Sequence, residues 1–323
     1  METLILGADD VRKLFTIEDA VAAVEEAFAA HGRGETIMPA KVYLPLERHE
    51  GDFRAMPAYL NGTAGVKWVN AHPHNPRRHG LPAVMGVLIY SDPETAAPLA
   101  IMDATRITAF RTGAAAAVAA KHLARKSATS VGLVGCGVQA GAALAALRTV
   151  FPVQQLLLFD LSKEAIDRFQ QRHGGAIGKI GDVAACDIVC TTTPSRMPVL
   201  RREMIRDGTH VNAMGADAPG KQELDPRILA GARVFLDDMT QACESGEVNV
   251  PLHDGAFKRE QIAGTLGEVV AGLKPGRETD AQITVFDSTG LAVQDLAVAR
   301  RVYEAARAQG IGNAVRLVDP VLY

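Results

Sequence analysis

The sequence has few cysteines, and none of them is spaced as a pair. Cys136, Cys186, Cys190 and Cys243 are the only four among 323 residues, and no C-x-x-C motif occurs. Free thiols in a reducing cytoplasm are therefore the simplest interpretation. Cys136 lies in a glycine-rich turn without an evident basic partner, so we expect it to fill space rather than to act as a nucleophile.

Long apolar runs and runs of basic charge are also absent. The longest apolar windows, such as residues 114–120, are too short to span a bilayer. The first fifteen residues carry Glu2, Asp9 and Asp10 where a signal peptide would carry Lys or Arg. The formal net charge is -3, and no basic run suggests nucleic-acid binding. We therefore expect a cytoplasmic protein without a membrane or nucleic-acid partner.

The length of the chain and the change in its pattern indicate two domains. Residues 16–30 have a helical pattern that begins at Thr16, with Asp19 three residues later as in a capping box. Four short strand candidates separated by Pro, Gly and Asn turns then predict an antiparallel β region, and a long helix follows. These strands are residues 41–44, 54–56, 65–69 and 84–90, and the helix is residues 103–123.

From residue 130 onward, short apolar strands alternate with helices. This alternation predicts a doubly wound parallel sheet. The predicted strands are residues 131–134, 156–160, 187–191, 210–214, 233–237 and 283–287. The predicted helices are residues 140–149, 162–173 and 291–309.

A dinucleotide fingerprint follows the first of these strands. Gly135, Gly137 and Ala140 form G-x-G-x-x-A at the start of a helix, and Asp160 ends the next strand. The glycines permit a tight turn and close approach of a pyrophosphate, whose charge the helix N-terminus stabilises. Asp160 suits the adenosine ribose hydroxyls and would repel a 2′-phosphate, which favours NAD over NADP. The alternative is a glycine-rich turn that binds nothing.

Further cofactor contacts are expected from the same loop and from loops after later strands, because carboxyl ends of strands line such a cleft. The complete set of expected NAD-binding residues is Gly135, Gly137, Val138, Gln139, Ala140, Asp160, Thr192, Thr193 and Ser288.

The H-x-H of His72 and His74 is similar to a metal motif but lacks a clear third ligand. Pro73 between the two histidines favours a turn instead. We therefore predict no metal site.

Four cations lie in or beside apolar segments. Each of Lys41, Arg54, Lys67 and Arg111 taken alone is compatible with a solvated or snorkelling side chain. Taken together, they could surround a small carboxylate through charge-assisted hydrogen bonds. Asp217 follows a predicted strand beside Gly and Pro, which suits a proton shuttle or, equally, an Asx-turn or helix cap.

Five stretches together resemble the ornithine cyclodeaminase/μ-crystallin family along nearly the whole chain. They are KWVNAHPHNP, AFRTGAAAAVAAKHLAR, VGCGVQA, HVNAMGADAPGKQELD and FDSTGLAVQD. The resemblance implies a Rossmann domain, residues 116–295, inserted into an α/β domain formed by residues 1–115 and 296–323. That α/β domain would bind the substrate and form a homodimer. The family binds NAD(H) or NADPH and transfers a hydride at the α-carbon of an amino or imino acid.

The resemblance also implies roles for individual residues. Lys67 and Arg111 would hold the substrate carboxylate, with Lys67 polarising the reacting group. Lys41 would stand at the place of a further carboxylate-binding arginine, and Asp217 would be the acid/base for the amine proton. At Arg54 the sequence departs from the cyclodeaminases, which carry a glutamate suited to a distal ammonium. A guanidinium there would repel that ammonium by about 4 kcal/mol at ~4 Å and an effective dielectric near 20.

The residues around Lys41 and Arg54 are similar to those of archaeal-type alanine dehydrogenases within the family. We therefore expect NAD-dependent oxidation of L-alanine and reductive amination of pyruvate. The alternatives are reduction of a cyclic ketimine such as Δ1-pyrroline-2-carboxylate, ornithine cyclodeamination, and non-catalytic binding of the μ-crystallin kind.

Overall fold

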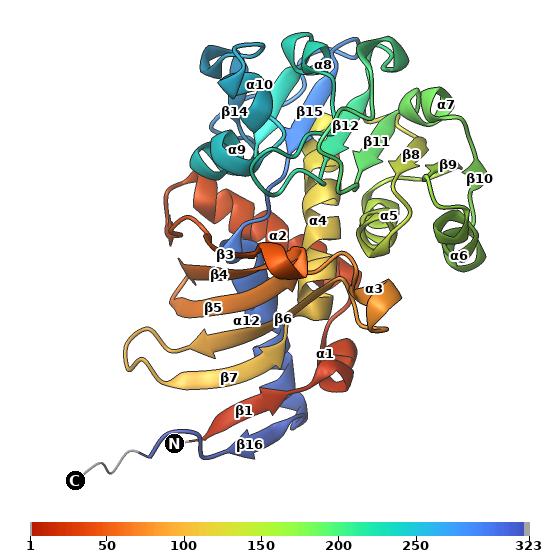
Figure 1. The fold of residues 1–323 in the computed structure, drawn as a ribbon. Coiled ribbons are helices and arrows are strands. Elements are labelled where there is room, and N and C mark those ends of the chain that lie inside the picture. Colours follow the sequence, from red (N-terminus) through yellow and green to blue (C-terminus); the bar gives the residue numbers. More distant parts are fainter. Residues whose placement is uncertain (1, 320–323) are drawn as a thin grey trace. The chain divides into compact units, whose positions relative to one another are not determined.

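The computed structural model describes residues 2–319, which form two compact units (Figure 1). Unit 1 comprises the chain up to Arg111 and the chain from Leu291 onward, and unit 2 is Thr112–Gly290. The expected domain boundaries, 115/116 and 295/296, lie a few residues from these divisions. The difference has a consequence for chemistry, because it assigns Gln294 and Asp295 to unit 1.

Unit 1 contains a mixed eight-stranded sheet. Its strand order is β16-β1-β7-β6-β5-β4-β2, with β3 also paired to β4, and every pairing except β1 with β7 is antiparallel. The strands are β1 (Thr3–Leu6), β2 (Thr36–Ile37), β3 (Val42–Leu46), β4 (Gly51–Leu60), β5 (Thr63–Ala71), β6 (Val84–Ser91), β7 (Pro98–Asp103) and β16 (Asn313–Val315). The antiparallel β region predicted from the turn residues is confirmed.

Long helices of unit 1 pack on this sheet and on one another. They are α1 (Ala8–Leu14), α2 (Ile17–Gly32), α12 (Ala292–Gln309) and the first part of α4 (Thr105–Leu123), with the short α3 (Asn75–Arg78) and the 3-10 turn η1 (Glu47–His49) in loops. The expected capping box of α2 is present, since Thr16 Oγ1 accepts from the Asp19 amide and Asp19 Oδ2 accepts from the Thr16 amide. Helix α12 contacts α2, β4 and β5, so its buried face lies against the part of the sheet that contains Lys67.

The two faces of the sheet differ in character because side chains alternate along each strand. Met56, Lys67 and Leu88 are register partners across β4, β5 and β6, and all three are buried. The next partners, Trp68 and Val87, belong to the opposite face and are 45% and 47% exposed. Lys67 is thus directed to the buried face, while an apolar face is left open to solvent within unit 1.

Unit 2 is built on an eight-stranded, wholly parallel sheet in the order β10-β9-β8-β11-β12-β15-β13-β14. The strands are β8 (Ser130–Val134), β9 (Gln155–Phe159), β10 (Ala176–Ile177), β11 (Ile188–Thr191), β12 (His210–Ala213), β13 (Arg233–Leu236), β14 (Ile262–Thr265) and β15 (Thr284–Asp287). The chain crosses from β9 on one side of β8 to β11 on the other, so the sheet has a topological switch point between β8 and β11. The predicted doubly wound α/β fold is confirmed.

The helices of unit 2 connect these strands. They are the rest of α4, α5 (Val138–Val150), α6 (Lys163–His173), α7 (Ile180–Ala184), α8 (Pro226–Ala230), α9 (Met239–Ser245), α10 (Asn249–His253) and α11 (Leu266–Val270), with the 3-10 turns η2 (Arg202–Met204) and η3 (Arg259–Gln261). The strand residues are largely Val, Ile and Leu, as expected of strands covered on both faces.

Candidate active site

Lys67 is the centre of a buried charged group in unit 1. Its side chain is 1% exposed, and its Nζ donates to Asp295 Oδ2 at 2.6 Å and to Thr108 Oγ1 at 3.3 Å. Burial lowers the pKa of the Lys67 amine to about 7, although Asp295 acts in the opposite direction and Arg111 adds to the lowering. The amine is therefore close to its titration point at neutral pH.

Arg111 completes this group from helix α4. Its Nε donates to Asp295 Oδ1 at 3.1 Å and its Nη1 donates to Gln294 Oε1 at 3.3 Å. Asp295 thus shares one carboxylate between two cations, which leaves an excess of one positive charge when Lys67 is protonated. Gln294 Nε2 is buried and has no hydrogen-bond partner among residues 2–319. The net charge and the unpartnered donor of this group are suited to one further carboxylate.

Asp295 and Gln294 were not among the residues expected from the sequence. They lie in the first turn of α12, in the stretch FDSTGLAVQD, and both are buried. They are two adjacent polar residues within an otherwise apolar run, and this pattern could have identified them from the sequence. No sequence pattern, however, pairs Asp295 with Lys67, which is 228 residues away along the chain.

Arg54 and Lys41 belong to the same region of unit 1. Arg54 pairs with Val69 while Met56 pairs with Lys67, so Arg54 lies on the same face of the sheet, one diagonal step from Lys67. Lys41 is half-buried before β3, and its charge contributes to lowering the pKa of Lys67. The structure therefore brings the four cations expected from the sequence into one unit.

Arg54 has a counter-ion that sequence reasoning missed. Its Nε donates to Asp52 Oδ1 at 2.8 Å and its Nη2 to Asp52 Oδ2 at 3.1 Å, in a bidentate pair. The guanidinium also lies 5.2 Å from the centre of the Tyr43 ring. Two of its donors are thereby held in place, and its charge is partly offset.

Asp217 lies in unit 2, in the loop that follows β12. Its Oδ1 accepts from Lys221 Nζ at 2.6 Å, and its side chain is 30% exposed. The carboxylate is therefore reachable by solvent and small molecules, with an ammonium beside it. This is compatible with the proton-transfer role expected for Asp217.

Glu223 fixes the loops around Asp217 and was not predicted. This fully buried carboxylate accepts from Thr191 Oγ1 at 2.6 Å, from the amide and Oγ1 of Thr193 at 2.7 Å each, and from the amide of Gly215 at 2.8 Å. It therefore joins the loop after β11 to the loop after β12. A Cβ at Gly215 would lie 2.2 Å from the Thr193 carbonyl oxygen, so only glycine permits this approach.

The glycine-rich loop of unit 2 has the geometry of a phosphate cradle. Gly135 has φ of +94°, and a Cβ there would lie 2.9 Å from Thr192 Oγ1. Gly137 caps α5 in an extended conformation without a side-chain hydrogen bond, and no atom lies within 4 Å of the place of its Cβ. The first amides of α5 are thus available to an anion.

Among the other residues expected at the dinucleotide site, Asp160 and Thr192 contact this loop. Asp160 Oδ2 accepts from the Cys136 amide at 2.7 Å, which places its carboxylate beside the glycines. Gln139 Oε1 is buried without a hydrogen-bond partner in the described part of the chain. Ala140 is buried against the sheet, Val138 is 76% exposed, and Ser288 follows β15. These features fit a bound dinucleotide.

Two further expectations concern Cys136 and the histidines. Burial raises the pKa of the Cys136 thiol to about 12, so it is neither a thiolate nor a nucleophile. His72 and His74 lie in unit 1, and no group of three or more His, Cys, Asp or Glu side chains within residues 2–319 is arranged to hold a metal ion. The helices of this part of the chain include none with the length and hydropathy of a membrane span.

Comparison with known proteins places these features in a family. The sequence profile of the ornithine cyclodeaminase/mu-crystallin family matches residues 1–310. An alanine dehydrogenase of Archaeoglobus fulgidus is 49% identical over 98% of this chain and 99% of its own length. A Δ1-pyrroline-2-carboxylate reductase of Bacillus cereus is 33% identical over 97% of this chain and 99% of its own.

A solved structure agrees with the sequence comparison. An archaeal alanine dehydrogenase dimer with bound NAD matches with a TM-score of 0.95 at 49% identity, over 98% of this chain and 100% of that chain. The buried Lys67–Asp295–Arg111 group, the phosphate cradle and these matches lead to one conclusion. The chain belongs to the ornithine cyclodeaminase/mu-crystallin family.

Proposed function

We propose that the protein is an NAD-dependent L-alanine dehydrogenase, which catalyses pyruvate + NH4⁺ + NADH + H⁺ ⇌ L-alanine + NAD⁺ + H2O. The observation that carries the proposal is the buried group of Lys67, Arg111 and Asp295, in which two cations share one carboxylate. Its excess positive charge suits the carboxylate of a small 2-oxo or amino acid. The similarity to the Archaeoglobus fulgidus enzyme supports the choice of pyruvate and alanine.

The cofactor in this proposal is NAD. The open space at Gly137 and the uncapped start of α5 suit a pyrophosphate, and the Asp160 carboxylate suits ribose hydroxyls rather than a 2′-phosphate. The solved archaeal alanine dehydrogenase was obtained with bound NAD, which supports the same choice. When bound, the nicotinamide supplies or accepts the hydride.

The residues of the chain bind, orient and transfer protons. Lys67 and Arg111 hold the substrate carboxylate and fix the orientation of the α-carbon, and Lys41 adds positive potential. Lys67 also polarises the carbonyl or imine. Asp217 is the acid/base that transfers the amine proton, and its carboxylate is paired with the Lys221 ammonium.

Arg54 restricts the side chain that the substrate can carry. Asp52 offsets part of the charge of the Arg54 guanidinium, and the remainder would repel a distal ammonium such as that of ornithine. A methyl group carries no charge and meets no such penalty. This is the physical reason for proposing alanine rather than ornithine.

The proposal is tested by following NADH oxidation with pyruvate, with and without ammonium. We expect oxidation only when ammonium is present, with L-alanine as the product. Equal oxidation without ammonium would instead identify a 2-hydroxy acid dehydrogenase.

Asp217→Asn should reduce turnover while NADH still binds. If turnover is unchanged, the proton-transfer role of Asp217 is excluded, and if no substrate is turned over, non-catalytic binding of the μ-crystallin kind is favoured.

A second candidate function is the reduction of a cyclic ketimine such as Δ1-pyrroline-2-carboxylate. The similarity to the Bacillus cereus reductase favours it, and the same carboxylate group would serve it. It differs in needing no ammonium. Ornithine cyclodeamination ranks third because of Arg54, and release of proline from ornithine would reverse that ranking.

We further propose that the protein is a homodimer that uses the open face of the unit 1 sheet. Trp68, Val87 and Ile89 lie on this face with exposed fractions of 45%, 47% and 38%. Contiguous exposed apolar side chains of this kind mark interaction surfaces. The archaeal alanine dehydrogenase was solved as a dimer, which supports a second copy of the chain as the occupant.

A further inference from the structure

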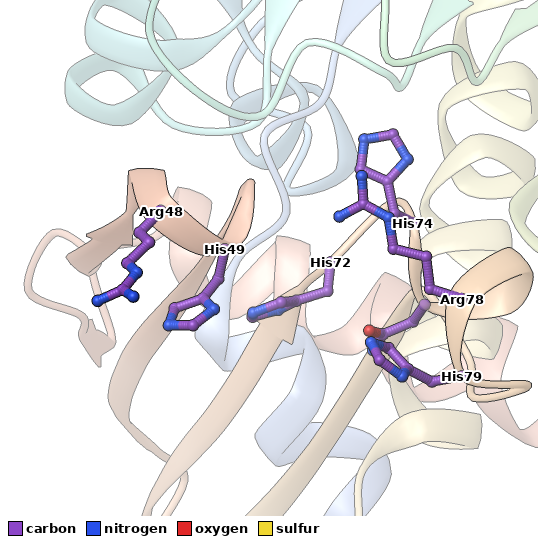
Figure 2. Close-up of a pocket in the computed structure, with 7 residues that line it drawn as sticks. Arg48, His49, His72, His74, Arg78 and His79 are labelled. Atoms are coloured by element: carbon purple, nitrogen blue, oxygen red, sulfur yellow. The ribbon is translucent and has the colours of Figure 1, made fainter.

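A polar pocket that plays no part in the proposed reaction lies wholly within unit 1. Its volume is about 190 Å³, and its walls come from η1, from the end of β5 and from α3 (Figure 2). The lining residues are Arg48, His49, His72, His74, Asn75, Arg78 and His79. Every one of them carries a nitrogen that can donate a hydrogen bond, and none is an acid.

His72 is held in a single orientation with its donor toward the pocket. Asn70 Oδ1 accepts from the Met85 amide at 2.9 Å, so the Asn70 Nδ2 amide faces His72 Nδ1 at 3.1 Å and donates to it. Neutral His72 therefore carries its proton on Nε2. A Cβ at Gly51 would lie 2.6 Å from the His72 ring, so glycine leaves the space that the ring fills. The ring points toward His49 (Figure 2).

The opposite wall contains an ion pair between Glu50 and Arg78, and Asn75 Nδ2 in this wall donates to the Pro82 carbonyl at 3.2 Å. Glu50 Oε2 lies 2.6 Å from Arg78 Nη2, and Glu50 Oε1 lies 3.7 Å from His74 Nε2. Glu50 has a left-handed backbone with φ of 52°, an uncommon conformation for a non-glycine residue. Arg48, His49 and His79 make no side-chain hydrogen bond or ion pair within the described part of the chain.

The charges of this pocket favour an anion over a cation. Two arginines outweigh one glutamate when all four histidines are neutral, and each protonated histidine adds a further positive charge. The other charged neighbours in sequence are Glu47, Asp52 and Arg77, of which Asp52 is engaged by Arg54. A cavity of this size also exceeds the ~30 Å³ of one water several-fold.

We propose that this pocket binds a phosphoryl group, either as inorganic phosphate or as the phosphate of a small monoester. A tetrahedral dianion presents acceptors in several directions, which matches donors contributed by three chain segments. The lining residues are all polar, and most of the pocket surface is polar, which disfavours a hydrocarbon skeleton. The site thus differs in location and chemistry from the buried Lys67 group. The proposal of phosphate binding does not depend on the proposed reaction.

The test is calorimetric titration of the whole protein with inorganic phosphate at constant ionic strength. NAD⁺ and pyruvate are kept saturating, so that the phosphate cradle and the carboxylate group are occupied. We expect one saturable site per chain near pH 6.5. Arg48→Gln removes a donor that has no protein partner, so it should weaken phosphate about tenfold without unfolding the chain. Arg77→Gln, on α3 but outside the lining, is the matched control and should change nothing.

Two further titrations, with sulfate and with glycerol phosphate, identify the role of the histidines and the ligand. Sulfate remains a dianion from pH 6 to pH 8, so a gain in its affinity on acidification reports protonation of the protein, and His49→Asn should reduce that gain. Tighter binding of glycerol phosphate than of phosphate would identify a monoester, and the reverse would identify free phosphate. The proposal is overturned if no saturable binding occurs, or if Arg48→Gln and Arg77→Gln bind phosphate equally.

Discussion

At the scale of single residues, the proposed chemistry depends on the Asp295 carboxylate, which forms ion pairs with two buried cations. Asp295 contacts Lys67 and Arg111 at 2.6 and 3.1 Å, and all three side chains are buried. Removal of one partner from a buried ionic group leaves uncompensated charge, which costs more than the group itself contributes. Asp295 is thus a positioning residue whose loss should affect both stability and substrate binding.

Asp295→Asn should lower the free energy of unfolding by about 3–5 kcal/mol near pH 6. The pKa of Lys67 is about 7 in the folded chain, below the ordinary value of 10.5. The unfolded chain therefore binds the extra proton between these values, and stability rises with pH across this window. An asparagine at this position no longer raises the pKa of Lys67. In the variant, the pH range over which stability rises therefore begins below pH 7, and its loss of unfolding free energy relative to the wild-type protein should be smaller at pH 8 than at pH 6.

Urea unfolding of both proteins at pH 6 and pH 8 measures this difference. Glu304→Gln on the exposed side of α12 is the control, and an equal deficit at both pH values would contradict the argument.

The same amine should make pyruvate binding pH-dependent. Lys67 binds a carboxylate only when it is protonated, and its pKa of about 7 means that the free enzyme loses this proton as the pH rises above neutrality. With NAD⁺ as the bound cofactor, so that no turnover occurs, the dissociation constant of pyruvate should rise by up to about tenfold per pH unit above 7. Calorimetry measures it directly. Lys67→Met should bind weakly at every pH, and a dissociation constant that stays flat in the wild-type protein would exclude Lys67 as the titrating ligand.

The residues of the site were only partly accessible to sequence reasoning. Lys67 and Arg111 were noticeable because cations are unusual in apolar segments, and Asp217 followed a predicted strand. Asp52, Asp295 and Glu223 were missed because their roles depend on partners that only folding brings near. Asp295 lies 228 residues from Lys67, and Glu223 lies 32 residues from Thr191.

At the scale of structural elements, Glu223 joins the carboxyl ends of two adjacent parallel strands. Its four hydrogen bonds reach the loop after β11 and the loop after β12. The first loop also contacts the glycine-rich turn, since Thr192 Oγ1 donates to the Gly135 carbonyl at 3.4 Å. A substitution at Glu223 should therefore change the affinity of the protein for its dinucleotide cofactor.

Glu223→Gln would present an amide N–H₂ to backbone donors that need an acceptor. We expect a loss of about 1–3 kcal/mol in the free energy of unfolding and a dissociation constant for NADH that rises several-fold. NADH fluorescence titration at a temperature where the variant remains folded separates the two effects. Glu203→Gln, on the exposed turn η2, is the matched control. Unchanged NADH affinity in Glu223→Gln would limit Glu223 to a structural role.

Element types followed from periodicity where the pattern was long enough. The buried strands of unit 2 and the helices α2, α4, α6 and α12 were predicted because many residues repeat one pattern. Strands β1, β2, β7, β10, β14 and β16 were not predicted; they have between two and six residues and depend on a neighbouring strand for their definition. The 3-10 turn η1 and helix α3, which line the proposed phosphate pocket, have three and four residues and were not predicted either.

At the scale of the whole molecule, the open sheet face of unit 1 is the feature that a single chain leaves unexplained. Val87 lies at its centre, in register with Trp68 on β5 and Asp103 on β7. A stable dimer interface buries roughly 800 Å² per partner. Side chains from several strands of this face would have to contribute to an interface of that size.

Val87→Lys should therefore convert the dimer to a monomer at micromolar concentration. Two buried ammonium groups would face one another across a two-fold interface, while in the monomer the introduced lysine can approach Asp103 and remain solvated. Sedimentation velocity measures the change. Ile177→Lys, on the exposed edge strand β10 of unit 2, should remain a dimer. If both variants sediment alike, the face is not the interface.

The central claim is that the protein aminates a 2-oxo acid reductively, and one comparison tests it most directly. The same preparation is assayed with NADH for kcat/KM on pyruvate with saturating ammonium and on Δ1-pyrroline-2-carboxylate without it. We expect a kcat/KM for pyruvate that exceeds the value for the cyclic imine by at least about tenfold, with no pyruvate reaction when ammonium is omitted. A higher kcat/KM for the cyclic imine would contradict the account and identify the protein as a ketimine reductase.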